Sequence, residues 1–202
     1  PVSPDDIPIN ESQPLHPANP YSVSKVAQDM LGLQYYLSHN LPIIRVRPFN
    51  HIGPGQSNRF VASAFASQIA AIERGKQEAI LYVGNLDARR DFTDVRDMVK
   101  AYHLVLTLGE PGAVYNIGSG QAHSIQELLD ILLNMSNTPI QVQPDQTRIR
   151  SVEVPIVVCD ASKIRATTGW VPTYAFEQTL ADILEDWRTR MSGTRQPVPA
   201  DI

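Results

Sequence analysis

Residues 21–47, YSVSKVAQDMLGLQYYLSHNLPIIRVR, are the stretch of sequence that decides the fold class. In its first part, apolar side chains recur every three or four positions, as on a helix with one apolar face; they are Val26, Met30, Leu33 and Leu37. Asn19 is a favourable N-cap and Pro20 suits the first helical position, so we expect the helix to begin here. Residues 41–47 are apolar and β-branched, which is typical of a parallel strand. The stretch therefore predicts a helix followed by a strand.

Helices and strands continue to alternate after this unit. We expect strands at 80–83, 113–117 and 140–142, and helices at 60–74, 94–108, 124–135, 161–167 and 176–190. Gly75 suits the end of the first of these helices, and Ser124 with Glu127 matches a capping box. Six prolines in residues 1–20 disfavour helix and predict an extended loop before Tyr21. The alternation predicts an α/β chain.

Composition narrows the class of protein. The chain has 202 residues, of which 43% are apolar and 19% charged, as in a globular protein with a sizeable core. Its net charge of -4 gives no electrostatic reason to expect nucleic acid or an anionic membrane as partner. No apolar run reaches the roughly 18 residues of a membrane span, and the start, Pro1 to Asp6, has neither an initiator Met nor a signal peptide. We expect a cytoplasmic protein whose printed sequence begins in mid-protein. The single cysteine, Cys159, lies in an apolar run and is expected to be an inert buried thiol.

Tyr21 and Lys25 are four residues apart, so on a helix they lie on one face, one turn apart. Moving a hydride to or from a carbon that bears oxygen requires a proton transfer at that oxygen. A free phenol, with a reference pKa of about 10, is a weak base at neutral pH, and a neighbouring ammonium favours the phenolate. The spacing therefore predicts an acid/base pair for hydride chemistry. The alternative is a solvent-facing pair, because helices also carry Tyr and Lys at this spacing by chance.

A dinucleotide site usually contains a Gly-rich turn with the spacing G-x-G-x-x-G between a strand and a helix. The printed sequence has no such segment. Gly118-Ser119-Gly120 comes nearest, because it lies between a predicted strand and a predicted helix, where backbone amides suit an anion. It lacks the third glycine, and we favour an ordinary strand-to-helix turn.

Five stretches of the sequence follow the order found in a known family of enzymes. They are LHPANPYSVSK (15–25), RPFNHIGPGQ (47–56), VGNLDARRDFTDVRD (83–97), YNIGSG (115–120) and TGWVP (168–172). Together they resemble the extended short-chain dehydrogenase/reductase family, also called the NAD-dependent epimerase/dehydratase family, which acts on nucleotide sugars. The residues around Asn50 and Arg90 are most similar to its GDP-mannose branch of reductases and 4,6-dehydratases.

The resemblance implies a fold and a domain organisation. The fold would be α/β, the C-terminal part of a Rossmann-type parallel sheet plus a small α/β substrate-binding domain. Residues 1–58 would end the dinucleotide-binding domain and carry the Tyr-x-x-x-Lys helix. Residues 59–190 would form most of the nucleotide-sugar-binding domain, with segments returning to the Rossmann sheet, and residues 191–202 would be a tail. The implied cofactor is NADP or NAD.

The resemblance also implies site residues. Tyr21 would be the catalytic acid/base, Lys25 would be its partner, and both would contact the cofactor. Arg47 and His51 would meet the nicotinamide end of the cofactor. The implied substrate-binding residues are Asn50, Val61, Arg90, Arg150 and Glu153, of which Arg90 and Arg150 would meet phosphate and Glu153 ribose hydroxyls. No metal site is implied.

Several of these residues have structural alternatives. His51 would instead be a loop histidine hydrogen-bonded to the backbone, and Arg90 would form an ion pair with the aspartate that follows it. The alternative for Val61 is a place in the core. For its neighbour Phe60, we prefer this assignment to the core. Arg148 is a rival of Arg150 for the phosphate.

The implied activity is NAD(P)-dependent reduction of GDP-4-keto-6-deoxy-D-mannose to GDP-D-rhamnose. Residues 50–56 are NHIGPGQ, whereas dehydratases of the branch generally carry NHESPRR, and this difference favours the reductase. The alternatives are a GDP-mannose 4,6-dehydratase or another nucleotide-sugar epimerase or dehydratase, and a non-catalytic fragment that only binds nucleotide sugar. The implied partners are a GDP-sugar and a second copy, in a homodimer or homotetramer paired through Leu31, Tyr35 and Tyr36 on the outer face of helix 20–38.

Overall fold

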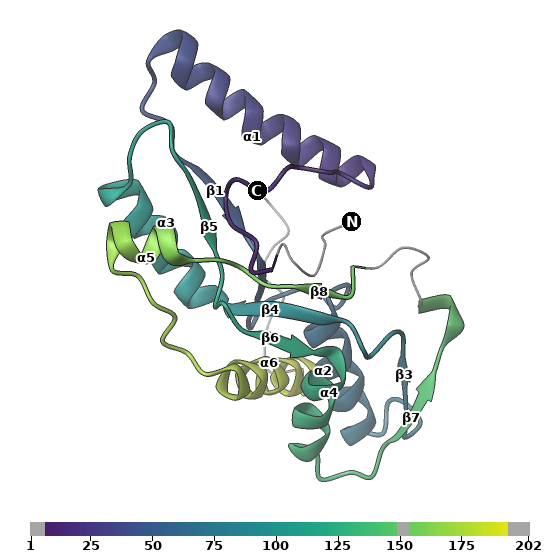
Figure 1. Cartoon of the computed structure of the whole chain (residues 1–202). Coiled ribbons are helices and arrows are strands. Elements are labelled where there is room, and N and C mark those ends of the chain that lie inside the picture. Colours follow the sequence, from purple (N-terminus) through teal and green to yellow (C-terminus); the bar gives the residue numbers. More distant parts are fainter. Residues whose placement is uncertain (1–6, 149–153, 194–202) are drawn as a thin grey trace. The chain divides into compact units, whose positions relative to one another are not determined.

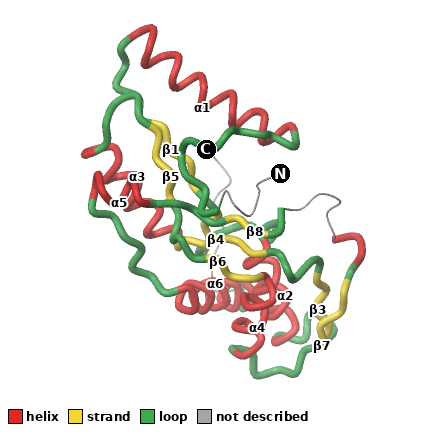
Figure 2. The backbone as a smooth tube through the Cα atoms, in the orientation of Figure 1, coloured by secondary structure: helices red, strands yellow, loops and turns green. Residues whose placement is uncertain are grey.

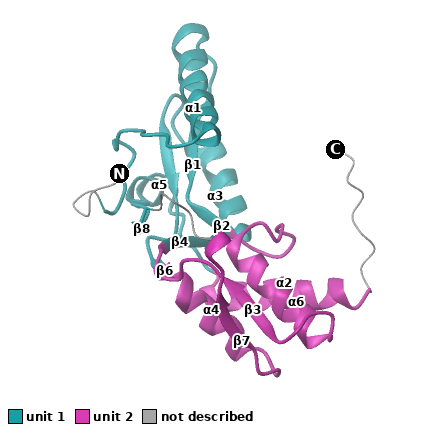
Figure 3. Cartoon of the chain, turned by 90° about the vertical axis from the view of Figure 1, so that its right-hand side faces the viewer, with its two compact units in different colours: residues 1–51, 90–122, 154–173 teal, residues 52–89, 123–153, 174–202 magenta. Residues whose placement is uncertain are grey.

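The computed structural model describes residues 7–148 and 154–193 (Figure 1). The chain divides into two compact units, each drawn from three stretches of sequence (Figure 3). Unit 1 comprises residues 1–51, 90–122 and 154–173. Unit 2 comprises residues 52–89, 123–153 and 174–202. Two stretches of the predicted substrate-binding region, 90–122 and 154–173, therefore lie in unit 1.

Unit 1 contains the helix and strand that the opening stretch predicts. Helix α1 spans Pro20–His39 and begins at the N-cap Asn19, as expected. Strand β1 covers Arg45–Pro48, so it begins later than predicted. It pairs in parallel with β5, Val114–Ile117, in a register that sets Arg45 opposite Val114. Helices α3, Val95–Leu108, and α5, Ser162–Thr168, complete the unit's regular elements, together with parts of the short strands described below.

The core of unit 1 is built around one face of α3. Met98, Ala101 and Val105 recur at helical spacing on that face and are buried. They pack with a cluster whose other members are Tyr115, Ile117, Cys159, Ala161, Ile164 and Trp170. Trp170 is 2% exposed and its indole N–H donates to the carbonyl of Asp97 at 3.0 Å, so a buried ring has its polar group satisfied.

Within its described residues, unit 2 (magenta in Figure 3) has three helices and a parallel pair of strands, drawn red and yellow in Figure 2. Helices α2 (Val61–Glu73), α4 (Ile125–Asn134) and α6 (Phe176–Met191) pack against one another. Strands β3 (Ile80–Val83) and β7 (Gln141–Pro144) pair in parallel, and a 3-10 turn, η2 (Gln146–Arg148), follows β7. Each helix buries an aliphatic face, as expected for the three helices that the sequence predicted. The buried residues of these three faces include Ile69, Ile72, Leu128, Leu132, Leu180 and Ile183.

Four short strands were not predicted from the sequence. They are β2 (Asn50–Ile52), β4 (Arg89–Asp94), β6 (Ala122–Ser124) and β8 (Ile156–Val157). Their order is β2-β4-β6, with β8 also paired to β4. Strands of two or three residues are too short to show a period, and β4 has the polar sequence RRDFTD, which reads as a loop.

The polar character of β4 is explained by Asp91, a buried carboxylate that accepts four hydrogen bonds. One of its oxygens accepts from the amide and the hydroxyl of Ser119, at 2.8 and 2.6 Å. The other accepts from the amides of Gly120 and Cys159, at 2.9 and 3.0 Å. An ionised carboxylate is costly to bury unless it is hydrogen-bonded in this way. Asp91 thus joins β4, the turn after β5 and the segment at Cys159.

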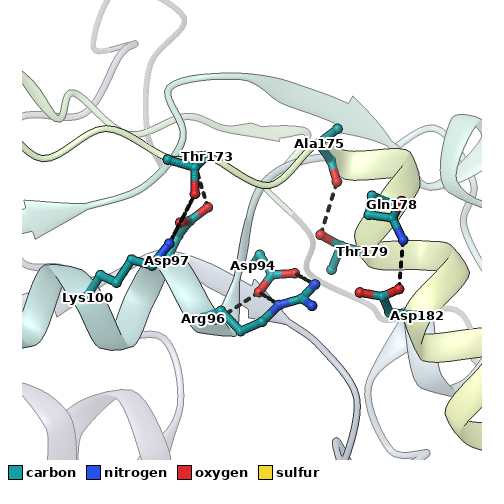
Figure 4. Close-up of polar contacts among 9 residues, drawn as sticks. All are labelled: Asp94, Arg96, Asp97, Lys100, Thr173, Ala175, Gln178, Thr179 and Asp182. Carbon is teal, nitrogen blue, oxygen red and sulfur yellow. Dashed lines mark hydrogen bonds and ion pairs between the residues drawn. The ribbon is translucent and has the colours of Figure 1, made fainter.

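Two further buried aspartates fix the first turn of α3 (Figure 4). Asp94 is the N-cap: it accepts from the amide of Arg96 at 2.7 Å and pairs with the guanidinium of the same residue at 2.7 Å. Asp97 accepts from the amide and hydroxyl of Thr173, at 2.7 and 2.8 Å, and from Lys100 Nζ at 3.3 Å. Asp97 thereby attaches the segment after α5 to helix α3.

In unit 2, Arg188 joins α6 to α2 through a forked ion pair. Its Nε and one terminal nitrogen donate to the two carboxylate oxygens of Glu73, at 2.8 and 2.7 Å. The same terminal nitrogen also donates to the carbonyl of Met135 at 2.9 Å. These hydrogen bonds from Arg188 lower the pKa of Glu73 below its ordinary value of 4.5, although partial burial works against them.

We expect Asp91→Asn to destabilise unit 1. An amide presents one acceptor and two donors where four donors converge, and a lost hydrogen bond to a charged group costs about 1.5–3 kcal/mol. The free energy of unfolding in urea should therefore fall by at least about 2 kcal/mol. Asp87→Asn, at an exposed position, is the matched control and should leave it unchanged. Equal stabilities of the two variants would contradict the structural role of Asp91.

The Glu73–Arg188 pair predicts a loss of stability in acid. Because the pKa of Glu73 is lowered on folding, the unfolded chain binds a proton at a pH at which the folded chain does not. The stabilisation is complete above the ordinary pKa of 4.5 and is lost as the pH falls through the lowered pKa. Urea unfolding of Glu73→Gln should show a shallower loss below that pH than the unsubstituted protein. Parallel pH profiles would show that the pair contributes nothing.

Candidate active site

The two residues predicted to form the acid/base pair lie side by side on α1. Lys25 Nζ is 5.7 Å from the centroid of the Tyr21 ring. Tyr21 is 71% exposed and Lys25 is also exposed, so the phenol and the ammonium are accessible from the same side of the helix. A phenol can hold or release a proton at a bound oxygen, and an ammonium offers three donors to hydroxyl groups.

Local sequence places the pair at the start of α1. The side-chain oxygen of Asn19 accepts from the amide of Ser22 at 2.8 Å, and Pro20 occupies the first helical position. Tyr21 therefore lies in the first turn and Lys25 one turn later. The positive end of the helix dipole and the ammonium give this surface a positive potential.

Arg47, on β1, has two partners within unit 1. One terminal nitrogen donates to the Asp29 carboxylate at 2.6 Å, and the other donates to the carbonyl of Glu11 at 3.1 Å. Arg45, two residues earlier on β1, also lies 3.6 Å from the Asp29 carboxylate. The prediction that Arg47 contacts the cofactor stays a prediction. Asp29, its carboxylate partner, was missed from the sequence because nothing local distinguishes it from a solvated helix residue.

Asn50 and His51 lie in the short strand β2, one residue after the end of β1, and both are exposed. Nδ1 of His51 lies 3.3 Å from the carbonyl of Phe49, which is the backbone contact expected for a loop histidine. The cofactor role of His51 and the substrate role of Asn50 stay predictions.

Arg90 lies on β4, directly before the buried Asp91. Its guanidinium donates to the carbonyl of Pro155 at 3.5 Å. The Asp91 carboxylate accepts its four hydrogen bonds from backbone amides and the Ser119 hydroxyl, so it has strong partners other than a guanidinium. The anion-binding role of Arg90 stays a prediction.

The remaining predicted substrate residues lie in unit 2 or outside the described residues. Val61 opens α2 and is half-buried, so its backbone lies at the start of that helix. Phe60 is 57% exposed, and its assignment to the core was wrong because it precedes the buried face of α2. Arg150 and Glu153 lie outside the residues that the structure describes.

The Gly118-Ser119-Gly120 turn already contains its anion, which is the carboxylate of Asp91. The amides of Ser119 and Gly120 both donate to it. Gly118 is required by close approach, since a Cβ there would collide with Cys159. The prediction of an ordinary turn in place of an anion site agrees with this, but the turn leads from β5 into the short strand β6 and not, as predicted, directly into a helix.

The thiol of Cys159 is inert, as expected. The residue is 2% exposed, and burial, reinforced by the nearby Asp91 carboxylate, raises the pKa of the thiol far above its usual range. A thiol that does not ionise is neither a nucleophile nor a metal ligand.

One predicted feature of α1 is corrected by the structure. Leu31 and Tyr35 are exposed on the outer face of the helix, at 56% and 42%. Tyr36 does not join them: its ring packs against Gly112, where any side chain would collide with it. The difference arises because Tyr36 is one helical position beyond Tyr35, which turns it toward unit 1.

The described part of the chain contains neither a metal-ligand cluster nor a membrane-spanning helix. Across 7–148 and 154–193, no three His, Cys, Asp or Glu side chains are grouped so as to hold a metal ion. Within the same ranges, no helix combines the length and the apolar character needed to cross a membrane.

Sequence comparisons match this chain with nucleotide-sugar enzymes. Residues 3–183 match the family model of GDP-mannose 4,6 dehydratase. The chain is 42% identical over 185 residues to GDP-6-deoxy-D-mannose reductase of Pseudomonas aeruginosa, covering 92% of this chain and 61% of that protein. It is 30% identical over 181 residues to GDP-mannose 4,6 dehydratase 2 of Arabidopsis thaliana, covering 89% and 48%. The predicted resemblance to the GDP-mannose branch is confirmed.

Solved structures show the same fold. RMD from Pseudomonas aeruginosa, complexed with NADPH, has a TM-score of 0.89 at 40% identity, over 94% of this chain and 63% of that one. UDP-glucose 4-epimerase of Thermus thermophilus, complexed with NAD, has a TM-score of 0.79 at 26% identity, over 92% and 59%. The chain thus spans less than two thirds of the length of these four relatives. Its α/β architecture is of the Rossmann type, as predicted. By the match over residues 3–183, the chain belongs to the GDP-mannose 4,6-dehydratase family of short-chain dehydrogenases/reductases.

Proposed function

We propose that the protein containing this chain is an NAD(P)-dependent oxidoreductase that reduces GDP-4-keto-6-deoxy-D-mannose to GDP-D-rhamnose. The observation that carries the proposal is the accessible Tyr21 phenol with the Lys25 ammonium 5.7 Å from its ring. The 42% identity to a GDP-6-deoxy-D-mannose reductase supports the choice of reaction within the family.

In the proposed reaction, the Tyr21 hydroxyl donates its proton to the C4 oxygen of the sugar as the carbonyl carbon is reduced. NADPH or NADH, when bound, would supply the hydride that reduces C4, so that the ketone becomes an alcohol. Lys25 stabilises the phenolate that remains and offers donors to the ribose hydroxyls of the cofactor. The residues present fit this role, because both polar groups are exposed on one side of α1. Lys25 Nζ donates to the Gln28 side chain at 3.2 Å, which engages one of its three donors.

Substrate binding is assigned to five residues. We propose that Asn50, Val61 and Arg90 contact the GDP-sugar, with the guanidinium of Arg90 on a phosphate. Arg150 and Glu153 would complete the site, as a phosphate donor and a ribose acceptor. Arg90 lies on the face of β4 opposite Asp91 and is only half-buried, which supports a guanidinium that a ligand can reach.

The 4,6-dehydratase reaction is the second candidate, because the matching family model carries that name. The two reactions consume different substrates: the dehydratase takes GDP-mannose, whereas the reductase takes the 4-keto sugar with stoichiometric NAD(P)H. Incubation of the full-length protein with each substrate, followed by product analysis, decides between them. Conversion of GDP-mannose without net consumption of NAD(P)H would favour the dehydratase.

The oligomeric state and the cellular location are each proposed from one observation. A homodimer or homotetramer would cover Leu31 and Tyr35, the exposed apolar residues of α1. A cytoplasmic location fits the single cysteine, Cys159. Sedimentation of the full-length protein would test the first proposal, and cell fractionation the second.

We expect Tyr21→Phe to abolish most of the turnover. Removal of a positioned general acid lowers kcat by about 10²–10⁴-fold, whereas binding of the GDP-sugar should change by less than about twofold. Turnover is followed by the loss of NADPH absorbance, and sugar binding by calorimetry. Tyr82→Phe, at an exposed tyrosine on β3, is the matched control and should keep normal turnover. Retained turnover in Tyr21→Phe would refute the assignment.

We expect Arg90→Ala to weaken GDP-sugar binding by about tenfold or more, since a hydrogen bond to a charged group contributes about 1.5–3 kcal/mol. Arg150→Ala should behave in the same way. Arg89→Ala removes an adjacent exposed guanidinium and is the control for a general loss of positive charge. An affinity unchanged by Arg90→Ala, measured by calorimetry with GDP-sugar, would remove Arg90 from the site.

A further inference from the structure

The helix that carries Tyr21 and Lys25 lies on the surface of unit 1. None of its residues, Pro20–His39, all of them described, is buried. Within the described residues, α1 is joined to the rest of unit 1 by specific contacts.

These contacts lie on one stripe that also contains the proposed catalytic pair. Tyr21, Lys25, Asp29, Gly32 and Tyr36 follow one another at spacings of four, four, three and four residues, which places them on one face. The first two lie at the open end of the stripe, and the last three contact the rest of unit 1.

The contacts of the stripe begin with close backbone packing. At Gly32, a Cβ would be 3.4 Å from Cγ of Arg45 and 3.5 Å from Cγ2 of Ile43, so the helix lies directly on these side chains. Further along, the ring of Tyr36 packs against Gly112. Close packing therefore holds this end of the helix.

An ion pair holds the end of the helix that is nearer Tyr21. Arg47 donates to the Asp29 carboxylate at 2.6 Å, and their side chains are 21% and 11% exposed. The other terminal nitrogen of Arg47 donates to the carbonyl of Glu11 at 3.1 Å, in the loop that leads to α1. The Glu11 carboxylate in turn accepts from the amide of Asn116 on β5 at 2.8 Å. One guanidinium on β1 therefore binds the chain both before and after Tyr21.

We propose that Arg47, acting through Asp29, is a positioning residue that sets the placement of Tyr21 and Lys25. This inference rests on the proposed function of the pair. Charge-assisted hydrogen bonds that are shielded from solvent are stronger and more directional than exposed ones. Their loss removes the contacts by which Arg47 joins β1 to the first two turns of α1 and to the loop before it. A shift of about 1 Å at a reacting group can cost about 10²-fold in rate.

The test is a double-mutant cycle in the full-length protein. Arg47→Met and Asp29→Asn each remove one end of the pair, and each should lower kcat by about tenfold. The double variant should be no slower than either single variant, because both break the same contact. The dissociation constants for NADPH and for the GDP-sugar should stay within about twofold of the original values. Arg47→Lys should recover part of kcat, since an ammonium can reach Asp29 without the fork that also reaches Glu11.

A second readout does not depend on turnover. Hydrogen exchange of the amides of residues 21–29, followed by mass spectrometry, should become faster in Arg47→Met and in Asp29→Asn. Arg188→Met is the matched control, since it breaks a forked ion pair of similar exposure in unit 2. It should lower the stability of the protein without changing kcat or the exchange of α1.

Three outcomes would overturn the positioning role. They are wild-type kcat in both single variants, multiplication of the two effects in the double variant, and weakening of NADPH binding by Arg47→Met but not by Asp29→Asn. The last would make Arg47 a cofactor ligand instead. Failure of the proposed function gives a different result: Tyr21→Phe would then retain turnover, while hydrogen exchange would still report whether Arg47 holds the helix.

Discussion

The carboxylate of Asp91 is the interaction on which unit 1 depends. It is buried, and it accepts hydrogen bonds from Ser119, Gly120 and Cys159. Three segments far apart in the sequence meet at this one charge, so a neutral or shorter side chain would leave several amides unsatisfied. The same carboxylate fills the glycine turn that would otherwise suit an external anion. Its neighbour on β4, Arg90, is the residue to which we assign phosphate binding. Of these two adjacent residues, Asp91 therefore has the structural role and Arg90 the proposed binding role.

Helix α1 is joined to unit 1 by a different kind of contact. It carries the proposed catalytic pair, and within the described residues it meets unit 1 through polar and close-packed contacts along one stripe. An ion pair between Asp29 and Arg47 is directional, whereas apolar packing tolerates small rotations. The unit therefore combines an apolar core around α3 with a helix that is joined to it by an ion pair at one end and by close packing at the other. This combination leaves Tyr21 and Lys25 accessible while their backbone is held.

The sequence predicted the long elements well and the short ones poorly. Helices such as α1 and α3 were found because their caps, Asn19 and Asp94, and their apolar spacing are local signals. Strands β2, β4, β6 and β8 were missed, since a strand of two or three residues has no period and the aspartates of β4 resemble a loop. Phe60 was assigned to the core although it is exposed, because its apolar character alone does not show on which side of a helix start it lies.

The sequence by itself determined the Tyr21–Lys25 pair, because a spacing of four residues on a capped helix fixes two side chains on one face without help from the rest of the chain. It also determined that Cys159 would be a buried thiol. Only the tertiary structure decided that Arg47 would meet Asp29 and Glu11, which are 18 and 36 residues away from it. Such contacts depend on how strands pair and helices pack, and no local spacing encodes them. The proposed catalytic pair could therefore be predicted from neighbours in the sequence, whereas the contacts that we propose orient it required the fold.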